Sequence, residues 1–210
     1  RYTVQPVARG IADALLIGRE FLGQGELCLV LGDNIFWSPD LPQRLKDAAR
    51  CNLGGTVFGC RVEDPRPFGV VEFDADGKAV SIEEKPEHPK SNYIVPGLYF
   101  YSAEAMDIAA HLTPSPRGEL EITDVNLEYL RRGQLRVIPL EDDYIWLDAG
   151  NADSLLAAAQ TIRDLQQRRG QYVGCIEEDA HRAGWIDGEQ LRALGQAMAM
   201  TTYGKHLLEL

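Results

Sequence analysis

Basic residues, paired cysteines and long apolar runs are all scarce in this sequence of 210 residues. Lys and Arg total 21 against 32 Asp and Glu, a formal net charge of −11. This balance excludes a broad nucleic-acid-binding face, which needs clustered positive charge. No apolar run is long enough to span a bilayer and no signal-peptide pattern is present, so we expect a cytoplasmic protein without membrane contact.

Cysteine and histidine show no spacing that is typical of a metal or redox site. None of the four cysteines has a close partner, which excludes a Cys-x-x-Cys motif. Cys28 and Cys60 lie in strand-like runs, so we expect buried, reduced thiols. The histidines are scattered and form no ligand pattern; they are His88, His111, His181 and His206.

Apolar residues make up 45% of the chain and charged residues 25%, which is ordinary for a globular protein with a sizeable core. The most informative stretch is the apolar run Leu27–Leu31, followed by Gly32 and Asp33. Five apolar residues without alternation predict a central strand that is covered on both faces. Ligands gather at the carboxyl ends of such strands, where Asp33 would lie, although a simple Asx turn explains the same residues.

A second stretch is built in the same way. Tyr144–Leu147 is β-prone and is followed by Asp148 and Gly150. Two strand-end carboxylates that are distant in sequence could converge above one sheet. Because Mg²⁺ is held by one or two carboxylates together with water and substrate phosphates, we expect Asp33 and Asp148 to be metal ligands.

Hydrophobic periodicity and turn residues predict an α/β domain over residues 1–170 and a helical segment over residues 171–210. The predicted strands are Thr3–Val4, 27–31, 55–62, 68–73, 79–83, 93–101, 135–140 and 144–147. The predicted helices are 11–21, one from about Pro42 to Cys51, one capped by Ser102, one capped by Thr123, and 152–169, 177–184, 187–200 and 203–210.

Three further positions carry groups suited to a sugar nucleotide. Glu84 and Lys85 end a predicted strand, where a carboxylate suits sugar hydroxyls and an ammonium suits a phosphate; a solvated charged turn is the more ordinary interpretation. Gln5 could pair with the edge of a base, although a lone Gln is usually a surface residue. Trp146 is more often a core residue than part of a ligand site.

Taken together, these residues resemble the sugar-nucleotide pyrophosphorylases, in their thymidylyl-transferring branch. The likeness covers nearly the whole chain. Its stretches are Val4–Pro6 with Gly10, Leu31–Phe36, Phe68–Phe73, Glu83–Pro86, Lys90–Tyr93, Gly97–Tyr101, Arg117–Asp124, Trp146–Asp148, Gly184–Asp187 and Tyr203–Gly204. The resemblance implies a three-layer, Rossmann-like α/β fold with a mixed sheet, of the nucleotide-diphospho-sugar transferase type.

The resemblance also implies a reaction and a site. The oxygen of glucose-1-phosphate attacks the α-phosphorus of dTTP, and dTDP-glucose and pyrophosphate are released, as a first step towards dTDP-rhamnose. The implied roles are Mg²⁺ ligation by Asp33 and Asp148, thymine contact by Gln5 and Gly10, sugar contact by Glu84, Gly69 and Val95, phosphate contact by Lys85, and a place beside Asp148 for Trp146.

The chain departs from the family pattern in a few places. Phe68 stands where relatives usually have Tyr, and Ala149 where they usually have Thr. No stretch matches the family's glycine-rich triphosphate loop with its Arg and Lys, so we expect a further segment before Arg1, and little activity if the polypeptide begins there.

A uridylyltransferase and a non-catalytic sugar-nucleotide-binding module remain alternatives. By the same resemblance, the helical segment is expected to contribute to a homotetramer and to feedback by dTDP-rhamnose.

Overall fold

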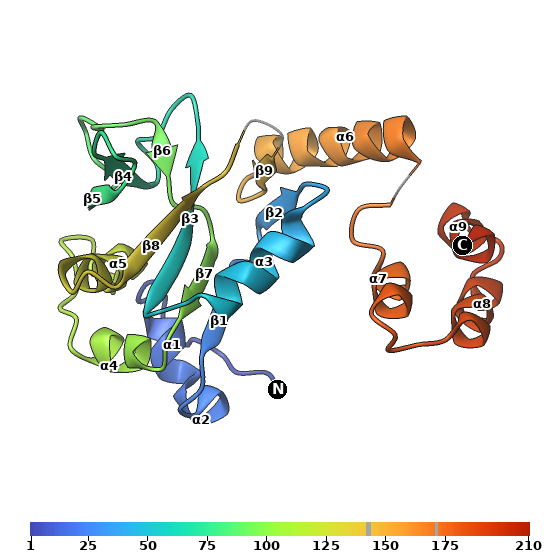
Figure 1. The fold of residues 1–210 in the computed structure, drawn as a ribbon, viewed down its shortest axis with the longest axis horizontal. Coiled ribbons are helices and arrows are strands. Elements are labelled where there is room, and N and C mark those ends of the chain that lie inside the picture. The colour runs from blue at the N-terminus through green and yellow to red at the C-terminus, as the bar shows by residue number, and fades with distance from the viewer. Residues whose placement is uncertain (142–143, 171) are drawn as a thin grey trace. The chain divides into compact units, whose positions relative to one another are not determined.

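The computed structural model describes residues 1–141, 144–170 and 172–210 (Figure 1). Gln171, at the start of the helical segment predicted from the sequence, lies outside these residues. The helices are α1 Asp13–Ile17, α2 Arg19–Leu22, α3 Leu41–Arg50, α4 Glu104–Ala110, α5 Ile122–Arg131, α6 Ala152–Arg169, α7 Ile176–Arg182, α8 Gly188–Ala197 and α9 Thr202–Glu209. The strands are β1 Leu27–Val30, β2 Asn34–Trp37, β3 Gly55–Arg61, β4 Gly69–Phe73, β5 Ala79–Glu84, β6 Tyr93–Ile94, β7 Leu98–Tyr101, β8 Leu135–Pro139 and β9 Ile145–Asp148.

The chain divides into two compact units, Arg1–Leu155 and Leu156–Leu210. The division falls inside α6, earlier than the boundary at Gly170 that the sequence suggested. The first unit contains every strand among the described residues, and the second contains α7, α8, α9 and most of α6.

A mixed sheet forms the centre of the first unit. Its strand order is β1-β7-β3-β6-β4-β5, with β8 also paired to β3. The β3–β8 pair is parallel, whereas β1–β7, β3–β7, β3–β6, β4–β6 and β4–β5 are antiparallel. The mixed sheet expected from the resemblance is confirmed.

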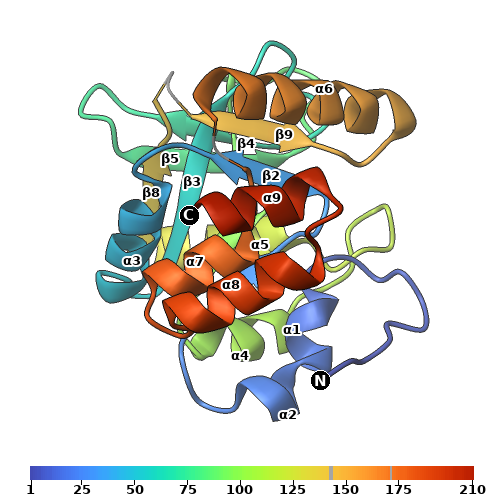
Figure 2. The same cartoon turned by 90° about the vertical axis from the view of Figure 1, so that its right-hand side faces the viewer.

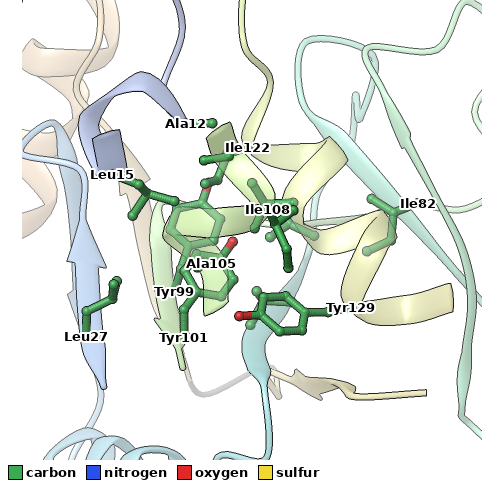
Figure 3. Close-up of a cluster of buried hydrophobic side chains, with 14 of the residues drawn as sticks. Ala12, Leu15, Leu27, Ile82, Tyr99, Tyr101, Ala105, Ile108, Ile122 and Tyr129 are labelled. Atoms are coloured by element: carbon green, nitrogen blue, oxygen red, sulfur yellow. The ribbon is translucent and has the colours of Figure 1, made fainter. Parts of the chain in front are cut away.

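The two faces of this sheet carry separate hydrophobic clusters, because successive strand residues point in opposite directions. Val57 and Tyr99 belong to the larger cluster with residues of α1, α4 and α5, whereas Phe58 and Phe100 pack with Ala48 of α3 on the other face. Figure 3 shows the larger cluster, in which Tyr99, Tyr101 and Tyr129 are stacked. The arrangement has three layers.

Five local expectations are wrong. Strand β1 is not a central strand: within the described residues it pairs only with β7, and Cys28 is exposed rather than buried. Thr3–Val4 is not a strand, because it pairs with no other strand in the described part of the chain. The helix expected over 11–21 is two short helices joined at Gly18. Ser102 does not cap α4; its hydroxyl instead lies 3.0 Å from the Tyr129 hydroxyl.

The helical unit has a small core of its own, formed by Cys175, Leu191 and Leu207. Side-chain caps fix two of its helices. Asp187 and Gln190 form a reciprocal capping box at the start of α8, and the Thr201 hydroxyl accepts from Gly204 N at the start of α9. Figure 2 shows these helices in orange and red. Among the described residues, no helix combines the length and apolar character needed to cross a membrane.

Candidate active site

The acidic residues Asp33 and Asp148 are brought together by a short strand pair that the sequence did not predict. Strand β2 begins directly after Asp33 and pairs antiparallel with β9, so that Asn34 lies opposite Asp148. Ala149 N donates to Asp33 O at 2.8 Å. The two carboxylates therefore converge through a two-stranded ladder beside the main sheet, rather than at two strand ends of one sheet.

Both carboxylates face the open side of Gly150. A Cβ built on Gly150 would lie 3.0 Å from Asp148 Oδ1 and 3.5 Å from Asp33 Oδ2. Only a residue without a side chain leaves this space between the two acids. A space bounded by carboxylate oxygens suits a hard divalent cation, so these residues fit the metal that the sequence led us to expect.

Asn34 connects the acid pair to the rest of the site. Its side-chain amide donates to Asp33 Oδ1 at 2.8 Å, while its oxygen accepts from Trp146 Nε1 at 2.8 Å and from Gly97 N at 3.0 Å. The Trp146 ring is held further by edge-to-face packing on Phe68, at 5.4 Å between ring centroids. Three chain segments are thus fixed by one side chain.

Glu84 lies at the end of β5, and its carboxylate is held by side chains from two other segments. Thr123 Oγ1 donates to Glu84 Oε2, and Arg117 Nη2 lies 3.5 Å from Glu84 Oε1. A Cβ on Gly69 would lie 3.0 Å from Thr123 Oγ1 and 3.3 Å from Glu84 Oε2. Gly69 O accepts from Val95 N at 2.8 Å, so the backbone at Gly69 also holds the chain directly after β6.

Lys85 adopts a left-handed backbone conformation, with φ at 44°. This conformation is uncommon for a residue with a side chain, and such residues are concentrated at functional sites. Lys85 N donates to Phe68 O at 3.0 Å, which holds the turn. Among the described residues the Lys85 ammonium has no ion-pair partner, so it is free to meet an anion.

These groups line one pocket of about 270 Å³ in the first unit. Its charged lining consists of five acids and two cations: Asp33, Glu84, Glu119, Glu121, Asp148, Lys85 and Arg117. Arg117 is committed to Glu121, which accepts from it at 2.9 Å through both oxygens, and this contact raises the pKa of the guanidinium. Burial, together with the charges of Glu84 and Asp33, raises the pKa of Tyr99 well above its usual range.

Seven of the nine residues expected at the site line this pocket, namely Asp33, Gly69, Glu84, Lys85, Val95, Trp146 and Asp148. Gln5 and Gly10 do not. Gln5 Nε2 instead donates to Gly10 O at 3.1 Å and to Asp13 Oδ2 at 2.8 Å. Thr123, expected only as a helix cap, contacts Glu84 instead; Glu121 is the N-cap residue of α5.

The three-layer fold, the paired acids and the polar pocket are typical of an α/β enzyme that acts on a small polar ligand. Comparison with known proteins narrows the class. Residues 1–165 match the family described as Nucleotidyl transferase, and the chain belongs to this family.

Named relatives extend the comparison. The chain is 52% identical over 210 residues to a glucose-1-phosphate thymidylyltransferase from Xanthomonas campestris pv. campestris (strain B100), covering 100% of this chain and 71% of the relative. It is 48% identical to the enzyme of the same name from Neisseria meningitidis serogroup A, covering 100% of this chain and 73% of the relative.

Two solved structures share the fold. A Bacillus anthracis protein described as a glucose-1-phosphate thymidylyltransferase, in complex with a sucrose, is 40% identical with a TM-score of 0.69, covering 78% of this chain and 65% of that one. A UDP-glucose pyrophosphorylase complexed with UDP-glucose is 21% identical with a TM-score of 0.69, covering 78% of this chain and 66% of that one; it is similar in fold alone.

Proposed function

We propose that the protein transfers a thymidylyl group from dTTP to glucose-1-phosphate, giving dTDP-glucose and pyrophosphate. The observation that carries the proposal is a single pocket with the paired acids Asp33 and Asp148 and with the adjacent pair Glu84 and Lys85. Relatives named glucose-1-phosphate thymidylyltransferase, about half identical over the whole chain, support this substrate pair. A uridylyltransferase has no comparable support, since the similar UDP-glucose enzyme shares the fold alone.

Asp33 and Asp148 would hold a divalent metal, for which we propose Mg²⁺. Their oxygens bound the space beside Gly150, and oxygen donors match this cation. When bound, the metal would neutralise phosphate charge as it builds up in the transition state. Without it, the acidic lining would repel a triphosphate.

The sugar end is assigned to Glu84, Gly69 and Val95. Glu84 would accept hydrogen bonds from sugar hydroxyls, and Thr123 and Arg117 hold its carboxylate in place. Lys85, whose ammonium has no ion pair among the described residues, would bind the sugar phosphate as a point charge. Trp146 would form the wall beside Asp148.

The base is assigned to Gln5 and Gly10, although neither lines the pocket. The Gln5 amide donates to Gly10 O and to Asp13, so it would exchange these partners for the edge of thymine. Gly10 has φ at 99°, and a Cβ there would lie 2.4 Å from Leu120 O. This position therefore accepts only glycine, which keeps the loop close to α5.

The reaction needs positioning and charge neutralisation rather than a covalent enzyme intermediate. A phosphate oxygen of glucose-1-phosphate forms a bond to the α-phosphorus of dTTP, while the bond from the α-phosphorus to the bridging oxygen breaks and pyrophosphate leaves. Lys85 would hold the attacking phosphate, and the acid pair would fix the metal against the nucleotide.

Turnover of the full-length polypeptide with dTTP, glucose-1-phosphate and Mg²⁺ tests the proposal. Asp33→Asn and Asp148→Asn should each reduce kcat about 100- to 1,000-fold, because a fixed electrostatic contact is lost. Asp76→Asn, in the exposed β4–β5 turn, should leave it unchanged. Full activity in both acid variants would refute the mechanism.

Further expectations concern the complete protein. We propose that the helical unit, which includes the segment 171–210 predicted from the sequence, contributes to a homotetramer. We also propose that it takes part in feedback by dTDP-rhamnose, and that the protein works in the cytoplasm. Sedimentation of the purified protein tests the assembly: a tetramer supports the first assignment, and a monomer at assay concentration rejects it.

A further inference from the structure

The helical unit brings together three donor atoms of three different kinds. The sulfur of Cys175, a carboxylate oxygen of Glu178 and a ring nitrogen of His206 all lie within 4.8 Å of one another. Cys175 is the N-cap residue of α7, Glu178 lies in the first turn of that helix, and His206 comes from the last turn of α9. His206 thus meets Glu178, which lies 28 positions earlier in the chain.

We propose that these three side chains form a Zn²⁺ site that ties α7 to α9. Thiolate, imidazole and carboxylate are the three ligand types that Zn²⁺ takes in proteins. The soft sulfur donor favours zinc over Mg²⁺, so this site differs in chemistry from the all-oxygen acid pair of the first unit.

The geometry is close to what a zinc ion requires. Zinc bonds of about 2.0–2.3 Å place its donors roughly 3–4 Å apart, so the three atoms need to move only slightly to share one ion. His206 Nε2 and Glu178 Oε2 are 3.4 Å apart, which is long for a hydrogen bond but suitable for two ligands of one ion. Three protein ligands leave the fourth position to water.

Neighbouring side chains hold the donors in place. The Tyr172 ring packs on the His206 imidazole with 4.6 Å between centroids, and Arg182 binds Glu178 Oε1, which leaves Oε2 for the metal. Tyr203 donates to Glu177 and so fixes α9 against the start of α7. Such outer contacts orient ligands and raise metal affinity.

Burial and charge also favour an ion here. Cys175 is 3% exposed, and the side chains of Glu178 and His206 are 21% and 15% exposed. A thiolate and a carboxylate together cancel the two charges of Zn²⁺, and the thiol proton leaves to solvent on binding. His206 also lines a pocket of about 510 Å³, so its side of the site is accessible from solvent.

The site gives a physical reason for the stability of a small unit. Small scaffolds often need a metal or a disulfide in addition to their core. The hydrophobic cluster of this unit is small, with Cys175, Leu191 and Leu207 as its buried members among the described residues, and a metal that joins α7 to α9 would supplement it.

Zinc titration of the full, metal-stripped protein in competition with a chromophoric chelator tests the proposal. One equivalent should bind, and excess Mg²⁺ should not displace it. His206→Gln should weaken binding at least about tenfold through the loss of one ligand, whereas His88→Gln, an exposed histidine in the first unit, should bind as the wild type does. Equal affinity in both variants would overturn the proposal.

A second measurement needs no substitution and therefore does not depend on the folding of a variant. Zn²⁺ at a hundred times its Kd should slow alkylation of Cys175 by about a hundredfold, followed by peptide mass, while exposed Cys51 reacts at its former rate. Co²⁺ in place of Zn²⁺ should give a thiolate charge-transfer band. Unchanged alkylation of Cys175 and no such band would overturn the proposal.

Discussion

Asn34 shows how one amide can position several parts of a site. Its two ends hold Asp33, Trp146 and the backbone of Gly97 simultaneously. None of these contacts is local except the one to Asp33, so spacing along the chain gives no signal for them.

Asn34→Ala should therefore lower kcat/KM about 10- to 100-fold, which is typical for the loss of a group that orients a metal ligand. The Mg²⁺ concentration for half-maximal rate should rise, because Asp33 loses its donor. Steady-state rates at several Mg²⁺ concentrations measure this. Gln43→Ala, an exposed amide on α3, is the control, and an unchanged Mg²⁺ dependence would contradict the positioning role.

Gly69 is a second residue with a specific steric role. A Cβ there would press on Thr123 Oγ1 and Glu84 Oε2 and separate a donor from its acceptor. Gly69→Ala should raise the KM for glucose-1-phosphate about tenfold, the equivalent of roughly one hydrogen bond, with little change in the KM for dTTP. Gly25→Ala, whose added Cβ meets only Leu22 O at 3.9 Å, should leave both values unchanged.

At the scale of elements, hydrophobic periodicity predicted most helices and strands, but it could not predict contacts between distant segments. Strands β3, β4 and β5 and helix α6 lie close to their expected positions, because alternation and turn residues are local signals. The short strand β2 was missed: its four residues follow a turn in which Asn34 N donates to Leu31 O, and only pairing with β9 makes them a strand. An unbroken apolar run also failed to show that β1 pairs with β7 alone among the described strands.

The same limit applies to the site. Asp33 and Asp148 could be proposed because each lies at the end of a β-prone run, Asp148 directly after it and Asp33 one glycine further on. In the sequence, Thr123 looks like a helix cap. Its hydrogen bond to Glu84 depends on the fold, which places the end of β5 beside the start of α5. Residue type and spacing thus indicated which side chains could act on a ligand or metal, but not which neighbouring side chains position them.

The start of α3 offers a prediction about pH. Hydrogen bonds from Arg44, Tyr144 and Ser38 hold the pKa of Asp40 well below its usual range. A lowered folded-state pKa means that the stabilisation is present above the unfolded value of about 3.9 and is lost as pH falls through the folded value.

Asp40→Asn should therefore lower the urea midpoint at pH 7, and the gap to the wild type should narrow as pH is lowered below about 4. Fluorescence-monitored urea unfolding across this range checks the direction. Glu87→Gln, an exposed acid without an ion pair among the described residues, should show no such gap. A gap that stays constant from pH 7 to pH 3 would show that Asp40 acts through packing rather than charge.

At the scale of the whole molecule, the two units carry donor sets of opposite chemical character. The first unit offers the carboxylate oxygens of Asp33 and Asp148, and the second offers Cys175, Glu178 and His206. Hard oxygen donors suit Mg²⁺, whereas a thiolate with imidazole suits Zn²⁺. On these two proposals, one chain would bind two different metals at two separate sites.

Metal removal by a chelator, followed by separate restoration, should distinguish the two sites. Mg²⁺ alone should restore turnover, since only the first unit is assigned to catalysis. Zn²⁺ alone, at a hundred times its Kd, should slow hydrogen exchange in α7 and α9 by up to about a hundredfold, because the ion binds only the folded unit. Peptides from β4 and β5 (Gly69–Phe73 and Ala79–Glu84), which contain no donor of either set, serve as the internal control. If Mg²⁺ protected α7 and α9 equally well, the difference in ligand chemistry would not select the metal, and the assignment of zinc to the helical unit would fail while that of Mg²⁺ to the acid pair would stand.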